Sequence, residues 1–586
     1  MLSYNHLLLT IRRNHRVKHI LLLRIMVDIT ALKNHLMNNL KKRWYLAALT
    51  VVIIASTGFT TTDKYFEIVR NLDIFATLYK EVNAYYVDEV NPSTLMNTGI
   101  EAMLESLDPY TNYIPEDDIE DYRTHMTGQY GGIGCVIGNR EEKCLVLMPY
   151  EGFPAHKAGL TIGDELISID GVAIKSKNTG DISKLLKGQA GTSVKISLIK
   201  VGAATPIELT LQRERIKIDN VPYSGMVSSE TGIIKLSEFT ANASKDVQKA
   251  IHELKQKGAK SIVIDLRGNP GGLLSEAISI SNLFVPKDKL IVSTKGKIAE
   301  WNKEYFGTDV PEDIDIPLVV LINSRSASAS EIVSGVIQDY DRGVIVGQRS
   351  FGKGLVQATR PLSYNSQLKI TTAKYYTPSG RCIQAIDYSN RNEDGSVGKI
   401  PDSLQHNFTT ANGRVVRDGG GVKPDVEVDK ESIAPVIIGL VNKNLLFDYG
   451  TMYYLQHPTI AVAKDFVLSD AEYSDFVKWV EKKDYEYSTQ IEKTLAELEE
   501  ESKEEKYYDA IKVQLEDFKQ QIKHSKDKDL LTFKADIKRV LEEEIVSRYY
   551  LQKGLIEASF KYDNELKAAL KVLEVPAEYK KILSGK

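Results

Sequence analysis

Apolar residues follow two different spacings in the first part of the chain. From Lys64 to about Thr127 they lie three and four positions apart, as at Ile68 and Leu72, which predicts helices. From Tyr130 to about Ile218 they form short runs divided by glycine and aspartate turns. These runs predict a compact β-rich module with strands at Leu145–Met148, Glu165–Ile169, Ser193–Ile199 and Ile207–Gln212.

A third pattern, from Gly232 to about Val428, alternates apolar runs with helical segments and predicts an α/β core. The expected strands are Gly232–Leu236, Ser261–Leu266, Leu318–Ile322, Gly343–Val346 and Leu368–Ala373, and the expected helices are Ser244–Gln256, Leu273–Leu283 and Ser330–Gln338. Residues 385–418, rich in Asn, Asp and Ser, are predicted to form an inserted loop. From about residue 431 charged amphipathic helices are expected. The Glu- and Lys-rich stretch at 491–545 is typical of a solvated helical face, with a coiled-coil partner site as the alternative.

With 586 residues the chain is longer than one hydrophobic core usually organises, so several domains are expected. The patterns divide it into consecutive parts. These are an N-terminal extension with a signal or anchor segment (1–62), a helical region (63–128), the β-rich module (129–217), the α/β core (218–430) and a C-terminal helical domain (431–586).

The segment from Lys41 to Gly58 is a candidate targeting signal. Three basic residues precede an apolar run from Trp44 to Ala55, and small residues follow it. The run is shorter than the ~20 residues of a membrane span, so a secretory signal and a short uncleaved anchor are both open. Met37 would start a signal of normal length. We expect an exported protein, in the bacterial periplasm or on the periplasmic face of the inner membrane.

Composition narrows the classes of function. A net charge of −4 gives no electrostatic reason to expect nucleic acid as a partner. The three cysteines, Cys135, Cys144 and Cys382, are too few for a disulfide framework and lack the usual spacing of zinc ligands. No structural metal is expected.

A serine-rich segment, Asn323-Ser-Arg-Ser-Ala-Ser-Ala-Ser-Glu331, links the apolar run Pro317–Ile322 to a predicted helix. A hydroxyl at a helix N-terminus lies beside unpaired N–H groups and partial positive charge, both of which stabilise an oxyanion. Ser328 also begins a capping-box pattern with Glu331, so its alternative role is to start the helix.

The segment Arg349-Ser-Phe-Gly-Lys353-Gly354 follows another predicted strand. Its glycines allow a tight turn that brings the lysine amine close to another part of the chain. A lysine acts as a base only if burial lowers its pKa, and a solvated turn lysine is the alternative. The stretch also resembles a Walker A loop. Gly354 replaces the Mg²⁺-binding Ser or Thr, however, and Leu355–Thr359 predicts a strand instead of a helix, so nucleotide binding is disfavoured.

A third segment, Asp265-Leu-Arg-Gly-Asn-Pro-Gly-Gly272, also lies between a predicted strand and a helix. Consecutive glycines expose backbone N–H groups, which could complete an oxyanion site. Taken alone, the segment is a strand-to-helix turn.

Together these segments resemble the carboxy-terminal processing peptidases, also called tail-specific proteases, over about residues 64–428. The resemblance implies that Ser328 is the nucleophile and Lys353 its base, because the two residues have the family's spacing. It also implies supporting roles for Gln357 and Asp339. The oxyanion positions of the family fall on Gly272 and the N–H of Ala329. The family's core resembles the crotonase fold and needs no cofactor.

Three further segments, Tyr130–Gly134, Pro154–Gly159 and Gly163–Gly171, resemble the PDZ domain that this family carries before its core. Such a domain takes a peptide as an added strand. Its glycine loop, here Gly131, Gly132, Ile133 and Gly134, captures the terminal carboxylate. Lys187 stands where members of the family often have an arginine that couples peptide binding to activation. Lysine keeps the charge but lacks the planar fork of arginine.

The predicted fold is therefore a multidomain α/β protein in which a PDZ-like β-rich domain joins a crotonase-like α/β protease core, with N- and C-terminal helical regions. The predicted function is a serine endopeptidase for exported proteins with apolar C-termini, and an inner-membrane anchor and a homodimer are both open. A non-catalytic PDZ scaffold would lack Ser328 and Lys353. A crotonase-type acyl enzyme would lack the PDZ module and bind coenzyme A, for which no signature is present. A histidine-dependent hydrolase is disfavoured because none of the ten histidines lies in the three segments.

Overall fold

The computed structural model describes residues 64–140, 142–392, 395–526 and 528–585. The predicted signal segment, Lys41 to Gly58, lies outside them. The chain forms two compact units that divide after Ala102. The first unit contains a helix over 64–85 and most of α2 (Pro92–Glu105). No helix within the described ranges is long and apolar enough to cross a membrane.

The predicted β-rich module is a sheet in which all four predicted strands are present. Alternate residues of one strand, Val194, Ile196 and Leu198, are fully buried, as expected where one face of a strand is covered. Two helices, α4 (Pro154–Lys157) and α5 (Thr179–Leu186), complete the module. The strand order is β3 (Cys135–Arg140), β4 (Lys143–Pro149), β5 (Glu165–Ile169), β7 (Ser193–Ile199) and β8 (Ile207–Gln212), with β6 (Val172–Ala173) paired to β5.

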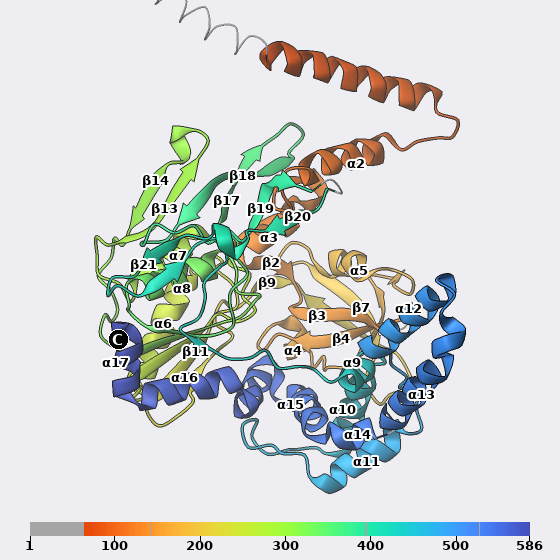
Figure 1. Ribbon diagram of the computed structural model, residues 1–586. Coiled ribbons are helices and arrows are strands. Elements are labelled where there is room, and N and C mark those ends of the chain that lie inside the picture. The colour runs from red at the N-terminus through yellow and green to blue at the C-terminus, as the bar shows by residue number, and fades with distance from the viewer. Residues whose placement is uncertain (1–63, 141, 393–394, 527, 586) are drawn as a thin grey trace, which may run out of the picture. The chain divides into compact units, whose positions relative to one another are not determined.

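A six-stranded sheet forms the centre of the α/β core (Figure 1). Its order is β10 (Tyr223–Met226), β11 (Thr231–Lys235), β12 (Ser261–Asp265), β15 (Leu318–Ile322), β16 (Val344–Gly347) and β23 (Val426–Glu427). Strand β10 is antiparallel to β11, and the other neighbours are parallel. Strand β15 is buried along its whole length, which is typical of a parallel strand covered on both faces.

Helices from distant parts of the sequence cover the two faces of this sheet. On one face, Ile262, Ile264 and Val320 share a buried cluster with α6 (Ala243–Gln256), α7 (Leu274–Asn282) and α8 (Ala329–Asp339). On the other face, Val263 and Val319 share one with α16 (Asn564–Glu574). The Tyr579 hydroxyl, on α17 (Pro576–Ser584), accepts from the N–H of Leu318. The predicted domain 431–586 therefore contributes its last two helices to the core sheet.

A second sheet flanks the core. Its order is β1 (Asn112–Ile114), β18 (Gln367–Tyr376), β13 (Leu290–Gly296) and β14 (Lys303–Phe306), and β17 (Leu355–Pro361) also pairs with β18. Because β17 is a strand where a Walker A loop requires a helix, the segment before it is not a Walker A loop, as predicted. The predicted inserted loop 385–418 contains two hairpins, β19 (Ile386–Arg391) with β20 (Val397–Lys399) and β21 (Asn407–Thr409) with β22 (Val415–Arg417), and is more ordered than expected.

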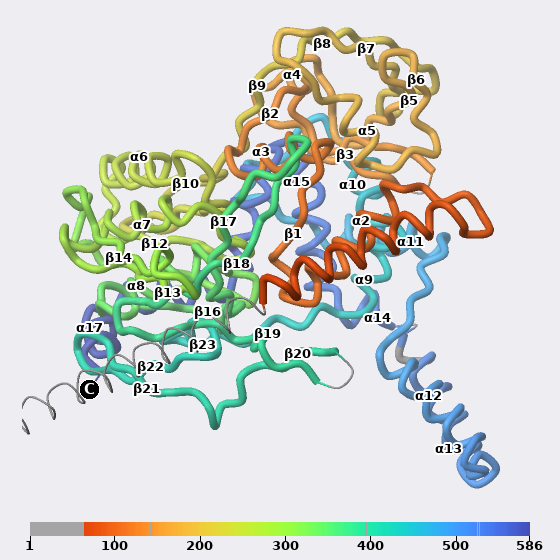
Figure 2. The backbone as a smooth tube through the Cα atoms, turned by 90° about the horizontal axis from the view of Figure 1, so that it is seen from above, coloured from red at the N-terminus to blue at the C-terminus, as the bar shows by residue number. Residues whose placement is uncertain are grey.

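The other C-terminal helices have an apolar core of their own, which includes Leu440, Phe476 and Ile545. Its main helices are α9 (Pro435–Asn442), α10 (Leu445–Gln456), α11 (Asp470–Val480) and α15 (Lys534–Ser559). Helices α12 (Gln490–Glu504) and α13 (Tyr508–Lys526) lie side by side and are mostly exposed, as the solvated-face prediction requires (Figure 2). The prediction extends too far, however, because Ile545 and its neighbours on α15 are buried.

Candidate active site

Ser328 lies between β15 and α8, at the helix N-terminus that the sequence predicts. Its backbone has φ 55° and ψ −112°, a conformation that costs an L-residue free energy and persists only where its surroundings enforce it. The neighbouring serines are fully buried and bonded to backbone carbonyls: Ser326 donates to Leu266 and Ser330 to Asn269. Ser328 is the partly exposed member of the three, which favours it as the nucleophile.

Two backbone N–H groups beside Ser328 are open. Among the residues that the structure describes, the N–H groups of Gly272 and Ala329 have no hydrogen-bond partner. Gly271 brings the two segments together, because a Cβ on it would lie 2.8 Å from the Ser328 Cβ and 2.9 Å from the Ala329 nitrogen. The two predicted oxyanion positions therefore belong to adjacent segments.

Asn269 fastens the glycine loop to the serine loop. Its side chain is fully buried, donates to the Leu236 carbonyl at 2.8 Å and accepts from the Gly271 N–H at 2.8 Å. Its own carbonyl accepts from the Ala327 N–H and from the Ser330 hydroxyl, each at 3.0 Å. These bonds fix the loop that carries Gly272 against the start of α8.

Glu331 joins the serine segment to the lysine segment. Its buried carboxylate accepts from the N–H groups of Ser328, Gly352 and Lys353 at 2.7–2.9 Å, and from the Ser350 hydroxyl. The bond from Ser328 is the glutamate half of the predicted capping box. Burial raises the pKa of Glu331 to about 7, although its four hydrogen bonds oppose that shift. The residue is therefore a hub between the two segments as well as a cap.

The Lys353 amine is held in a partly buried position. It lies 4.0 Å from the centre of the Tyr110 ring. Burial, and next the positive charge of Lys369, lower the pKa of Lys353 to about 8. A base must be neutral to accept a proton, so this shift suits a catalytic lysine at mildly alkaline pH. Within the described chain no hydrogen bond joins the Lys353 amine to the Ser328 hydroxyl.

A buried tyrosine contacts both predicted catalytic residues. The Tyr375 hydroxyl lies 3.1 Å from the Ser328 carbonyl oxygen and 2.7 Å from that of Lys353, and it donates to them. Gln357, the predicted support of the lysine, donates instead to the Thr371 hydroxyl at 3.2 Å. Gln357 thus lies on β17, just after the lysine segment, and in the described chain it is not bonded to Lys353.

Asp339 does not join this group, contrary to its expected place among the catalytic residues. It ends α8, whereas Ser328 begins it, and the helix between them is about 16 Å long. Its carboxylate forms a buried ion pair with Arg381 at 2.9 Å and accepts from the N–H of Ser379. The structure therefore gives Asp339 a structural partner at the far end of the helix.

The PDZ-like module has an open edge and open N–H groups. Strand β3 is at the edge of its sheet, with α5 beside it. The N–H groups of Ile133 and Gly134 have no partner among the described residues, while their carbonyls accept from Ala155 and Tyr150. Gly131 and Gly132 instead belong to β2 (Gln129–Gly132), which pairs with β9 (Glu214–Lys217). Of the four predicted loop residues, Ile133 and Gly134 present the free donors.

Lys187 directly follows α5 and contacts the segment that precedes the module. Its amine lies 2.7 Å from a carboxylate oxygen of Asp121, on α3 (Ile119–Thr127), and 5.5 Å from the centre of the Tyr130 ring. A cavity of about 530 Å³ opens beside these residues. Lys187 is therefore at a junction between the module and the helical region before it.

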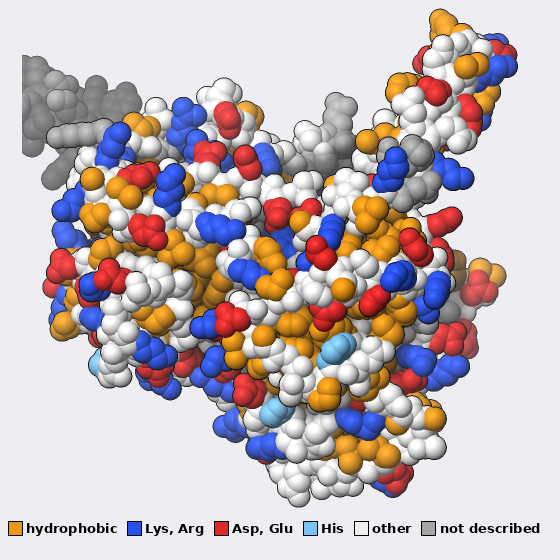
Figure 3. Space-filling view, turned by 90° about the horizontal axis from the view of Figure 1, so that it is seen from below, with side chains coloured by type: hydrophobic (Ala, Val, Ile, Leu, Met, Phe, Trp, Pro, Cys, Tyr) orange, Lys and Arg blue, Asp and Glu red, His pale blue; other side chains and the backbone are white. Residues whose placement is uncertain are grey.

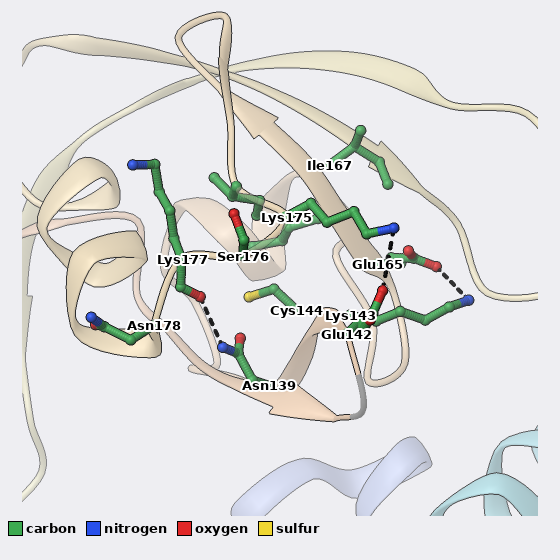
Figure 4. Close-up of a pocket in the computed structure, with 12 residues that line it drawn as sticks. Asn139, Glu142, Lys143, Cys144, Glu165, Ile167, Lys175, Ser176, Lys177 and Asn178 are labelled. Carbon is green, nitrogen blue, oxygen red and sulfur yellow. Dashed lines mark hydrogen bonds and ion pairs between the residues drawn. The ribbon is translucent and has the colours of Figure 1, made fainter.

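A second cavity, of about 640 Å³, lies at the end of β3 that is remote from Gly134 (Figure 4). Asn139 donates to the Lys177 carbonyl at 3.0 Å there, and the sulfur of Cys144 points into the space. Strand β3 rises about 3.3 Å per residue, so an extended peptide along it would pass from Gly134 toward this cavity.

The remaining polar chemistry is dispersed. No group of three or more His, Cys, Asp or Glu side chains among the described residues could hold a metal ion. All three cysteines are free, and burial raises the pKa of Cys135 to about 12. Basic and acidic side chains are interspersed over the face that Figure 3 shows.

Sequence reasoning missed Asn269, Tyr110 and Tyr375 and saw Glu331 only as a cap. Asn269 lies in the glycine-rich segment Asp265–Gly272. An amide side chain beside two glycines was the pattern that could have indicated its role. Tyr110 and Tyr375 contact Lys353 from distant parts of the chain, and no spacing along the sequence shows these contacts.

Comparisons with known proteins agree with this arrangement of modules. Residues 230–390 match "Peptidase family S41", residues 146–200 match "PDZ domain", and residues 436–573 match "Probable PDZ-protease, C-terminal helical domain". The chain is 36% identical over 347 residues to a carboxy-terminal-processing protease of Bartonella bacilliformis, which covers 58% of this chain and 78% of that protein. It is 33% identical to the carboxy-terminal processing protease CtpA of Bacillus subtilis, over 56% of this chain and 68% of that one.

Among solved structures, the photosystem II D1 C-terminal processing protease is 27% identical and aligns over 61% of this chain and 92% of its own, with a TM-score of 0.33. The PDZ domain of a carboxy-terminal protease from Vibrio cholerae, solved with a peptide, is 25% identical over 15% of this chain and 99% of its own, with a TM-score of 0.15. Because these TM-scores are low, the assignment to a family rests on the sequence matches.

Proposed function

Because this chain belongs to peptidase family S41 and is a serine-type carboxy-terminal processing peptidase, we propose that it cuts proteins with the pair Ser328 and Lys353. In this proposal the PDZ domain first engages the C-terminal end of the substrate. The open N–H groups of Gly272 and Ala329, set beside a partly exposed serine at a helix N-terminus, are the observation that carries it.

The chemistry follows from these groups. The neutral Lys353 amine takes the proton of the Ser328 hydroxyl as its oxygen attacks the substrate carbonyl carbon. The resulting oxyanion accepts from Gly272 and Ala329. The protonated amine then gives its proton to the leaving nitrogen as the peptide bond breaks. Water, activated by the same amine, hydrolyses the acyl-serine and restores the hydroxyl.

We further propose that the PDZ domain binds the terminal carboxylate of the substrate with the N–H groups of Ile133 and Gly134. The peptide would add to the free edge of β3 as an antiparallel strand. The predicted preference for apolar C-terminal side chains belongs to this proposal, in which the added peptide would lie along β3 with α5 beside it.

We also propose where the protein acts in the cell and how it assembles. The basic and apolar residues from Lys41 to Gly58 support export to the periplasm, with cleavage or anchoring in the inner membrane both open. The helix over 64–85 exposes many large apolar side chains, which supports a homodimer through this region. The crotonase-like arrangement of the core also stays a prediction.

Replacing Ser328 with alanine tests the proposal. Ser328→Ala should lower cleavage of an unstructured polypeptide with an apolar C-terminus by at least about 10⁴-fold, because the nucleophile carries the whole chemical step. Lys353→Ala should do the same. Ser324→Ala is the matched control, since Ser324 is an exposed serine of the same loop, and it should cleave as the wild type does. Near-normal turnover by Ser328→Ala would refute the mechanism and favour a non-catalytic PDZ scaffold.

A further inference from the structure

The first turn of α16 contacts both loops that carry the proposed catalytic groups. One loop runs from Arg267 to Gly272 and ends at a proposed oxyanion donor. The other runs from Gln348 to Lys353 and ends at the proposed base. Both are in the α/β core, whereas α16 belongs to the C-terminal helical region, more than two hundred residues later in the sequence.

Asp563, which caps α16, grips the first loop. Its two carboxylate oxygens accept from the two terminal nitrogens of Arg267 at 2.8 and 2.6 Å, a bidentate pair. The pair is largely shielded from water, with 14% of the Arg267 side chain and 9% of the Asp563 side chain exposed. Arg267 also forms a bidentate pair with the buried Asp265, at 2.8 and 2.9 Å, so its guanidinium is fixed from two sides.

Glu565 connects the same helix turn to the second loop. One of its oxygens accepts from the Gln348 amide at 2.7 Å, and the other lies 3.3 Å from Arg267. The Gln348 amide also donates to the Val428 carbonyl at 3.2 Å. A single helix turn therefore sets the starting points of the oxyanion loop and the lysine loop relative to each other.

We infer that Asp563 and Glu565 are positioning residues for the peptidase site. They hold the Gly272 N–H and the Lys353 amine in register with Ser328 through Arg267 and Gln348. The C-terminal helical region thus completes the catalytic geometry, in addition to covering the sheet. This inference rests on the proposed Ser328 chemistry.

Asp563→Asn separates this role from helix stability. Asparagine caps a helix as well as aspartate does, so the bond that Asp563 accepts from the Leu566 N–H is kept while the charge toward Arg267 is lost. A misplacement of about 1 Å can cost about 10² in rate, so kcat should fall between about 10- and 100-fold with KM within about twofold. Glu565→Gln should lower kcat less. Glu574→Gln is the matched control, because Glu574 is an exposed acid of the same helix, and its kcat should be unchanged.

The full-length protein is assayed with an unstructured polypeptide, and its affinity for a peptide aldehyde is measured in parallel. The aldehyde forms a tetrahedral adduct with a serine and needs the oxyanion donors, so Asp563→Asn should weaken its binding by about the same factor as kcat. Binding of an unreactive C-terminal peptide should stay the same. If Asp563→Asn and Glu565→Gln match Glu574→Gln in kcat and aldehyde affinity, while Ser328→Ala is inactive, the positioning role is wrong. If wild-type cleavage does not depend on Ser328, the proposed function fails instead. Should Asp563→Asn not fold, Glu565→Gln decides alone.

Discussion

The catalytic region and the PDZ domain each leave two backbone N–H groups open, but they hold those groups in different ways. Around Gly272 and Ala329 the loops are tied by fully buried side chains, chiefly Asn269 and Glu331. Around Ile133 and Gly134 the loop is held by hydrogen bonds to its backbone carbonyls and by the close packing of Gly134 against Phe153. The difference fits the two proposed tasks, because a transition state needs fixed donors, whereas a strand-adding peptide needs a free edge.

Of the substitutions considered, replacing Glu331 should have the largest effect, and it should disrupt the catalytic region. Glu331→Gln leaves one acceptor oxygen for four donors, so about two buried donors lose their partner. The free energy of unfolding should fall by about 2–6 kcal/mol, at 1–3 kcal/mol for each donor. Cleavage should fall at least about 100-fold, because the serine and lysine loops separate. Denaturant unfolding and steady-state kinetics measure both effects, and wild-type values for both would contradict the role of Glu331 as a hub.

The same substitution should change how stability depends on pH. The pKa of Glu331 is raised from 4.5 to about 7 in the folded state, so the folded protein holds this proton more tightly than the unfolded chain. The stability gained from binding this proton is fully present below pH 4.5 and is lost as the pH rises through about 7. Glu331→Gln should lack this decrease. An identical pH dependence in both proteins would contradict the raised pKa.

A substitution in the PDZ loop should affect recognition and leave the chemistry intact. A Cβ on Gly134 would lie 2.6 Å from the Cβ of Phe153, at a φ of 71°, so Gly134→Ala must displace the loop. We expect KM to rise about tenfold for free-acid substrates with kcat unchanged, since uniform binding is lost. An amidated substrate should show the higher KM with the wild-type protein already.

Gly152→Ala is the control for this test. Its φ of 81° imposes similar backbone strain, but a Cβ there meets no atom within 4 Å. A KM increase shared by both variants would point to general strain in the domain, and equal cleavage of free-acid and amidated substrates would exclude carboxylate recognition.

The smallest effect is expected at Lys187. Its ion pair with Asp121 is partly exposed, so Lys187→Ala should change the free energy of unfolding by less than about 1 kcal/mol. If this contact couples peptide binding to the catalytic site, Lys187→Ala should lower kcat a few-fold, whereas Lys187→Arg should keep it because arginine retains the charge. Unchanged kcat in both variants would exclude coupling through Lys187, and the PDZ domain would then act only in substrate recognition.

The sequence predicted the regular elements well because their signals are local. Short runs divided by glycine and aspartate turns marked the strands of the PDZ domain, and apolar runs alternating with helical segments marked β15 and its neighbours. The sequence did not predict that α16 packs against the core sheet. The apolar face of this helix shows that it is buried but not which surface it covers.

The candidate site was predictable in part for the same reason. Ser328, Lys353 and Gly272 are in short motifs at the ends of predicted elements. For Asp339 the motif gives a position along α8 but does not show that the helix separates it from Ser328. Contacts such as Tyr375 to Lys353 depend on tertiary packing and leave no local pattern.

The pH dependence of kcat/KM tests the central claim, that Lys353 is the base, most directly. Measured between about pH 6 and 10 in the wild type, kcat/KM should rise with an apparent pKa of about 8, as the free amine is formed. In Lys369→Gln the neighbouring positive charge is gone, so the apparent pKa should move upward. A flat profile, or one that Lys369→Gln leaves in place, would contradict the assignment of Lys353.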